Sequence, residues 1–105
     1  MATQLMRGYV VLTGIAKREG GQFVSHCREL DVSSCGDTAE EALENLGDAI
    51  KVYIDALTET RELSRVFRER HIRIDPPPKD NEVTIRVSPG DLCRAYAQSV
   101  PVEVA

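Results

Sequence analysis

Carboxylates are the first residues of this chain that could do chemistry, and their spacing gives little support to catalysis. Two-metal cleavage of a phosphodiester needs several carboxylates that converge on one pair of ions. The segment 8–16, which we expect to be a central strand, contains no Asp or Glu. Glu19, Glu29 and Asp31 fall in or beside expected turns. We therefore predict that these three carboxylates are solvated and hold no metal.

Histidines and cysteines are the next candidates, and they have no metal-ligand spacing. The chain has three cysteines and two histidines, without a Cys-x-x-Cys or His-x-x-x-His pair. His26 and Cys27 are neighbours in an expected strand, so their side chains point to opposite faces and cannot act together. We expect no metal, no cofactor and no enzymatic activity. The odd number of cysteines is typical of reduced thiols in a cytoplasmic protein.

Acidic residues gather in the expected long helix and outnumber the basic residues there. On helical geometry Glu40, Glu44 and Asp48 fall on one outward ridge, and Lys51 follows them. Such a ridge is usually a solvated face. The alternative is a docking surface for a cationic partner protein, with salt-sensitive binding. Glu40, Glu44 and Asp48 are therefore our candidate partner contacts.

A basic patch follows the acidic helix. Its four arginines are Arg65, Arg68, Arg70 and Arg73. One explanation is pairing with the acidic helix inside the chain or across a dimer. The other is phosphate contact with DNA, in which case Arg65 and Arg68 touch the DNA. Thr84 and Arg86, in the strand that we expect further along, would then join them.

Three short β-strands are expected to precede the long helix. Tyr9–Ala16 is a run of apolar and β-branched residues, Gly20-Gly21 predicts a hairpin turn, and Gln22–Cys27 returns. A short third strand is expected at Asp31–Cys35. Both faces of the first strand are largely apolar, and one helix covers only one face. We therefore expect the C-terminal segment or a second subunit on the other face, and infer a homodimer or tetramer.

The long helix is expected at about Ala39–Leu57. Asp37 or Thr38 can cap its first turn, where Glu40 and Glu41 also interact favourably with the helix dipole. Its apolar residues recur at three- and four-residue steps, which predicts an amphipathic helix packed on the sheet. A second helical stretch is expected at Glu62–Arg70.

Three consecutive prolines end the helical region and predict a stiff linker over 76–81. Residues 1–75 then form one β-β-β-α domain. Residues 82–105 form a C-terminal strand and tail, in the same domain or exchanged within a dimer. The tail is expected to contain a strand, a short helix and an edge strand, at Glu82–Val87, Asp91–Gln98 and 100–104.

The length of 105 residues fits one small domain. The net charge of −4 disfavours free nucleic acid as the ligand of the whole domain and favours a basic protein. No apolar run reaches the roughly 18 residues of a membrane span, and the N-terminus has no signal-peptide core. We expect a cytoplasmic protein without membrane contact.

The segment Tyr9–Leu57 combines the hairpin with Cys-x-Glu-Leu at Cys27–Leu30 and Gly-Asp-Thr-x-Glu-Glu-Ala-x-x-Asn-Leu at Gly36–Leu46. In this combination the segment resembles the HicB-like antitoxin family. Arg28 stands where proline is common in the family, and this is a mild departure from the pattern.

The resemblance implies an α+β fold, a β-β-β-α-β arrangement with a partial RNase H-like sheet and one long helix on one face. It implies an antitoxin that binds and occludes HicA, a small basic RNA-cleaving toxin, or an orphan relative of such an antitoxin. Family antitoxins often add a C-terminal module that binds operator DNA. Val83–Gln98 loosely resembles the first half of a ribbon-helix-helix unit, which makes a transcriptional regulator our alternative. Pro101 falls where the second helix should begin, and this speaks against DNA binding.

Overall fold

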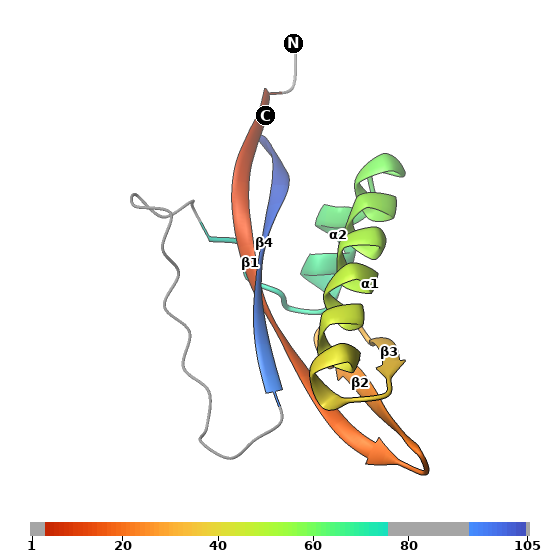
Figure 1. Ribbon diagram of the computed structural model, residues 1–105. Coiled ribbons are helices and arrows are strands. Elements are labelled where there is room, and N and C mark those ends of the chain that lie inside the picture. The colour runs from red at the N-terminus through yellow and green to blue at the C-terminus, as the bar shows by residue number, and fades with distance from the viewer. Residues whose placement is uncertain (1–3, 76–92, 105) are drawn as a thin grey trace.

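A computed structural model describes residues 4–75 and 93–104 of the chain. A four-stranded antiparallel sheet, in the order β3-β2-β1-β4, carries two helices, one of them long (Figure 1). The expected α+β class is confirmed. The elements are β1 (Gln4–Glu19), β2 (Gln22–Cys27), β3 (Val32–Gly36), α1 (Ala39–Glu59), α2 (Leu63–Glu69) and β4 (Cys93–Val104).

Strand β1 is twice as long as the expected Tyr9–Ala16, with 16 residues. Its C-terminal part pairs with β2, from Gly14 opposite Cys27 to Glu19 opposite Gln22. Its N-terminal part pairs with β4 on the other edge. The extension at the N-terminal end, from Gln4 to Gly8, pairs with β4, which lies far away in the sequence, so the local pattern of residues could not reveal it. The extension at the C-terminal end, from Lys17 to Glu19, continues the hairpin with β2.

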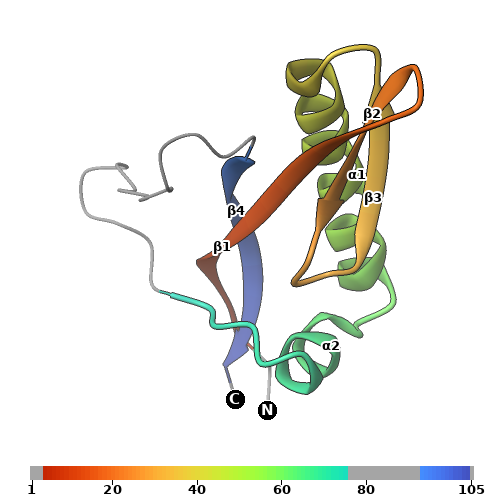
Figure 2. The same ribbon diagram turned by 90° about the horizontal axis from the view of Figure 1, so that it is seen from below.

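Both helices lie on one face of the sheet, and the core lies between the helices and the sheet (Figures 1 and 2). The buried stripe of α1 is the one expected from its spacing, and α2 contributes Leu63 and Phe67. The sheet contributes Val10, Leu12 and Val100 to this core, and all three are fully buried. The buried residues of α1 are Ala42, Leu43, Leu46, Ile50, Ile54 and Leu57.

A left-handed residue separates the two helices. Arg61 has φ 59°, the amide of Glu62 donates to the carbonyl of Leu57 at 2.9 Å, and the amide of Arg61 donates to Thr58 at 3.2 Å. This is the Schellman arrangement that closes a helix, here without the usual glycine. His71 closes α2 in the same way, with φ 56°.

The expected helix at Asp91–Gln98 is wrong over its described part, because Cys93–Val104 is one continuous strand. Pairing with β1 along its whole length decides the conformation. The expected edge strand at 100–104 is confirmed as the end of β4. The linker 76–81 and the strand Glu82–Val87 lie outside the described residues.

The described part of the C-terminal segment lies in the plane of the sheet, beside β1, and does not cover the sheet's second face. On that face Val11 is 36% exposed, and Tyr9 and Ile15 are partly exposed. The second subunit that we expect there stays a prediction. Within the described ranges, no helix is long and apolar enough to cross a bilayer.

Candidate protein-binding surface

The acidic ridge of α1, defined by Glu40, Glu44 and Asp48, lies on the side of the helix away from the buried stripe. All three side chains are exposed. None of them takes part in an ion pair with another described residue. Lys51 follows on the same ridge and is also exposed. The structure therefore brings the three candidate contacts together on one solvent-facing surface.

The N-terminal half of α1 is held firmly against the sheet. Thr38 Oγ1 accepts a hydrogen bond from the amide of Glu41 at 3.0 Å, so Thr38 is the N-cap. Asn45 Nδ2 donates to the carbonyl of Cys35 on β3 at 2.9 Å. On β2, the buried hydroxyl of Ser25 donates to the carbonyl of Ala42 at 2.6 Å. The acidic ridge is thus a preformed surface.

Gly36 shows why this turn needs a glycine. A Cβ atom at this position would lie 2.6 Å from the backbone nitrogen of Ala42. Together with the Thr38 cap and the Asn45 bond, this close approach gives a structural reason for the motif Gly-Asp-Thr-x-Glu-Glu-Ala-x-x-Asn. Its residues fix how α1 leaves the sheet.

Glu29 corrects our expectation of three solvated carboxylates. Its Oε1 and Oε2 accept from the backbone amide of Thr13 at 3.1 and 3.2 Å, and its Oε1 lies 3.6 Å from the Cys27 thiol. Strand β2 ends at Cys27, so it offers no backbone carbonyl to the amide of Thr13. The carboxylate of Glu29 accepts the hydrogen bond of this amide instead. A sequence pattern cannot reveal this role, because it depends on where the β1–β2 ladder stops.

Cys27 is fully buried. Burial raises the pKa of its thiol to about 11, a hydrogen bond with the backbone of Leu30 opposes this, and the charge of Glu29 adds to it. The thiolate, which is the nucleophilic form, is therefore scarce at neutral pH. Cys35 is exposed and Cys93 is partly exposed; all three thiols are free.

The side chain of His26 lies on the face of the sheet away from the helices, whereas that of Cys27 points into the core. His26 has two polar neighbours that were not expected from the sequence. Its Nδ1 lies 2.8 Å from Ser33 Oγ, and its Nε2 lies 3.5 Å from Asp31 Oδ1. The register of β2 and β3 sets His26 opposite Ser33, so a correct hairpin register would have predicted the contact.

Serine, histidine and aspartate, the residue types of Ser33, His26 and Asp31, also form the catalytic sites of many hydrolases, but the surroundings here do not suit nucleophilic catalysis. The side chain of His26 is 45% exposed and that of Asp31 is 73% exposed, so water competes for both. An open hollow of about 320 Å³ lies beside them, lined by charges of both signs. We interpret the contact as a cross-strand hydrogen bond. The hollow is lined by Ile15, Lys17, Glu19, Val24, His26, Arg28 and Ser33.

Metal ligation has no candidate in the described parts of the chain. No group of three or more His, Cys, Asp or Glu side chains there is arranged to hold an ion.

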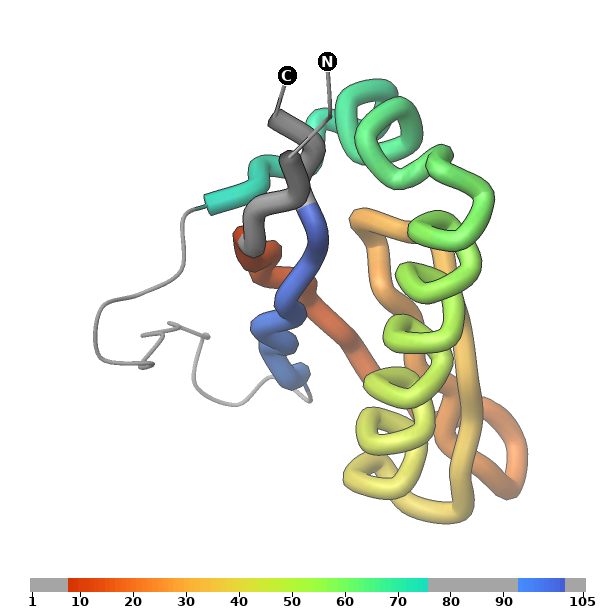
Figure 3. The backbone as a smooth tube through the Cα atoms, turned by 90° about the horizontal axis from the view of Figure 1, so that it is seen from above, coloured from red at the N-terminus to blue at the C-terminus, as the bar shows by residue number. Residues whose placement is uncertain are grey.

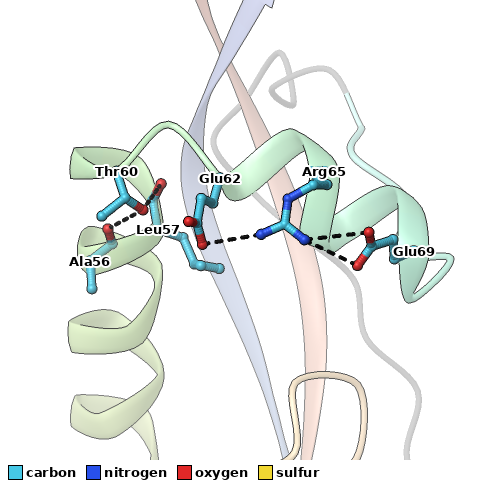
Figure 4. Close-up of polar contacts among 6 residues, drawn as sticks. All are labelled: Ala56, Leu57, Thr60, Glu62, Arg65 and Glu69. Atoms are coloured by element: carbon cyan, nitrogen blue, oxygen red, sulfur yellow. Dashed lines mark hydrogen bonds and ion pairs between the residues drawn. The ribbon is translucent and has the colours of Figure 1, made fainter.

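The basic patch is partly neutralised by its own neighbours. Arg65 pairs with Glu62 at 3.2 Å and with Glu69 at 3.4 Å, as Figure 4 shows. Arg73 pairs with Asp75 at 2.6 Å. The pairs lie within this segment, and none reaches the acidic ridge.

Arg65 is one of the four candidate DNA contacts, and its guanidinium is already paired with the carboxylates of Glu62 and Glu69. Arg68 is exposed and has no ion-pair partner among residues 4–75 and 93–104. Thr84 and Arg86 lie outside the described residues. The structure thus brings together the acidic candidate contacts, and of the basic candidates it describes only Arg65 and Arg68, three positions apart on α2.

Comparison with known proteins gives no family assignment. No family model matches the chain, and neither a curated protein nor a solved structure matches it.

Proposed function

We propose that this chain is a HicB-like antitoxin, or an orphan relative of one, that binds a small basic RNA-cleaving toxin of the HicA type. The observation that carries the proposal is the acidic ridge on a helix that the sheet holds in place. The order of elements, three strands before the long helix and a strand after it, agrees with the implied β-β-β-α-β arrangement. The partial RNase H-like assignment of the sheet is part of this proposal.

The mechanism is occlusion by contact, without bond making or breaking by this chain. Residues four positions apart on an α-helix are displaced by about 6 Å along the axis, so Glu40, Glu44 and Asp48 present a row of negative charges. A toxin that binds RNA carries cations on its RNA-binding surface, and this row competes with the RNA for them. Association is then fast at low salt and slows as the ionic strength rises.

The test begins with the reading frame beside this gene, which we expect to encode a small basic protein, and then measures the binding of that protein to this chain. The variant Glu44→Gln/Asp48→Asn removes two ridge charges with little change of shape. Exposed charge pairs contribute about 0.2–1 kcal/mol each, so the dissociation constant should rise roughly 2- to 30-fold, with the larger effect at low salt. Glu40 is left unchanged because its charge also stabilises the first turn of α1.

The matched control is Glu19→Gln/Asp31→Asn, which removes two exposed carboxylates, one at the end of β1 and one in the β2–β3 turn. This variant should bind as tightly as the unchanged chain. Equal weakening by both double variants would attribute the effect to net charge and would contradict a ridge-specific contact. No binding by the unchanged chain would refute the toxin partner.

DNA binding is the other outcome that the experiments must separate. A gel shift of the upstream DNA at two salt concentrations, lost on Arg68→Gln, would favour the regulator over the antitoxin.

A further inference from the structure

Strand β3 forms one edge of the sheet, next to the long helix. In the part of the chain that the structure describes, β2 is its only neighbouring strand. The strand runs from Val32 to Gly36 without a charged side chain or a proline, which are the residues that protect many exposed edges. Its outer edge therefore offers backbone amides and carbonyls to a further strand.

The segment 76–92 enters and leaves the described structure far from this edge. Asp75, just before the segment, pairs with Tyr9 on β1. Cys93, just after it, lies opposite Ile15 on β1. Both described ends of the segment thus lie beside β1, and β2 separates β1 from β3.

The direction of the backbone groups alternates along each strand, so it can be followed across the sheet. The amide of Thr13 donates to Glu29, just beyond the end of β2, so the odd-numbered residues of β1 bond toward β2. Ile15 lies opposite His26, so the even-numbered residues of β2 bond to β1. The odd-numbered residues of β2 are left to bond to β3.

This alternation shows which groups of β3 point outward. Ser34 lies opposite Ser25 and bonds to β2, so its neighbours Ser33 and Cys35 direct their amides and carbonyls away from β2. The carbonyl of Cys35 accepts from Asn45 of α1 at 2.9 Å, which agrees with this direction. The amide and carbonyl of Ser33 and the amide of Cys35 are the groups that a further strand can use.

Helix α1 carries an apolar strip, defined by Ala49, Val52 and Ala56, beside the same edge. These are the fourth, seventh and eleventh residues after Asn45, so they share the face of the helix that reaches Cys35. Figure 3 shows α1 alongside β3, and the two elements are in contact. The apolar strip therefore flanks the outer edge of β3.

Val52 is the most exposed large apolar side chain among the described residues, with 69% of its surface accessible. Ala56 is also exposed, and Ala49 is partly exposed. Valine is a weaker helix former than the charged residues around it. The fold thus gains neither burial nor helix propensity from a valine at this position.

Acidic side chains border the apolar strip. Asp48 lies four residues before Val52 and Asp55 three residues after it, so both are its neighbours on the helix surface, and both are exposed. Two copies of this chain joined at β3 would bring these acids toward each other. A basic partner is therefore favoured over a second copy by charge complementarity.

We propose that an extended segment of the basic toxin adds as a strand to the outer edge of β3 and packs on the apolar strip. Its backbone bonds to Ser33 and Cys35, an apolar side chain contacts Val52, and basic side chains beside it meet Asp48 and Asp55. In strand addition the main-chain bonds supply affinity and the alternate side chains supply specificity. This inference rests on the toxin partner proposed above.

The first test is hydrogen exchange of individual amides, followed by NMR, in the full chain alone and with the small basic protein that we expect the neighbouring reading frame to encode. In the free chain the amides of Ser33 and Cys35 should exchange fast and that of Ser34 slowly. In the complex the amides of Ser33 and Cys35 should exchange at least roughly tenfold more slowly.

The possible results separate this inference from the proposed function. A complex in which the Ser33 and Cys35 amides stay unprotected would refute the added strand alone. Slow exchange of both amides in the free chain would show that another segment already pairs with this edge, and would overturn the inference even if the toxin binds. Absence of a complex would refute the toxin partner and the added strand together.

The apolar strip is tested with Val52→Thr, which keeps the shape of the side chain and buries a hydroxyl in the proposed contact. The dissociation constant of the complex should rise roughly tenfold. The matched control is Val11→Thr, the same change at the exposed valine on the sheet face away from the helices. This control should bind as tightly as the unchanged chain, and equal affinities of the two variants would contradict the contact with Val52.

The edge itself is tested by comparing Ser33→Pro with Ser33→Ala. Both variants lose the hydroxyl that lies 2.8 Å from His26 Nδ1, and only the proline also removes the outward amide. Ser33→Pro should bind the toxin roughly tenfold more weakly than Ser33→Ala. Equal affinity of the two folded variants would contradict a strand on this edge; hydrogen exchange and Val52→Thr decide the matter if the proline variant does not fold.

Discussion

Gly47→Ala should destabilise this protein, although the same change normally stabilises an α-helix. Gly47 lies in the middle of α1, where alanine is favoured over glycine by about 1 kcal/mol. A Cβ at this position would lie 3.0 Å from Cε1 of Tyr96 on β4. The sign of the effect therefore depends on whether the tyrosine ring can move.

Tyr96 has little room to move. Its hydroxyl donates to the carbonyl of Leu43 on α1, and burial raises the pKa of that hydroxyl. On the side of the ring toward β1, a Cβ at Gly14 would lie only 2.8 Å from Cε2, so the ring is held between two glycines. Overpacking of this kind costs about 1–3 kcal/mol, which exceeds the gain in helix propensity. The expected net loss is about 1 kcal/mol, taking both effects together.

A double-mutant cycle tests this reasoning. Tyr96→Val keeps a residue that suits a strand and removes the ring. In that background Gly47→Ala should stabilise the protein by about 1 kcal/mol, so its effect changes sign. Urea unfolding followed by circular dichroism, at one fixed protein concentration, measures the four variants. Stabilisation by Gly47→Ala in the presence of Tyr96 would refute the tight packing between α1 and β4.

Two further predictions follow from backbone conformation and burial. Arg61→Gly and His71→Gly should each stabilise the fold by about 0.5–1 kcal/mol in urea unfolding, because both residues have positive φ at helix ends. The control Arg65→Gly, in the interior of α2, should destabilise the fold. A loss of stability on Arg61→Gly and His71→Gly would contradict the left-handed conformation at these two helix ends. Cys27 should make stability fall as the pH rises from about 9 to 11, because its thiol keeps its proton in the folded state up to a pKa of about 11 and ionises near 9.0 when unfolded. Cys27→Ala should show a shallower fall between pH 8 and pH 10.5 in the same unfolding assay, and an equal fall in both proteins would show that this thiol is not the cause.

The sequence predicted the elements whose determinants are local. The cap at Thr38 and the apolar steps of α1 specify a helix within one segment, and the hairpin at Gly20-Gly21 needs only its own turn. Those patterns located β2, β3, α1 and α2 to within a few residues. They also identified the acidic ridge, because helical periodicity alone decides which residues share a face.

Features that depend on distant contacts could not be predicted in this way. The residues of 91–98 fit a short helix locally, and pairing with β1 turns the described part into a strand. Glu29 looked like a turn residue because its acceptor role depends on where β2 ends. The contact of His26 with Ser33 follows from the β2–β3 register, which the sequence analysis did not assign. In each case the missing information was which segments lie side by side.

The role that we propose for this chain is to cover a basic RNA-cleaving partner, with no chemistry by the chain itself. The measurement is RNA cleavage by the small basic protein that we expect the neighbouring reading frame to encode, purified and mixed with increasing amounts of this chain. Our account predicts that cleavage stops near equimolar amounts, without added metal ions, and that Glu44→Gln/Asp48→Asn shifts the inhibition to higher amounts. Continued cleavage in an excess of the unchanged chain, or cleavage of RNA by this chain alone, would contradict it.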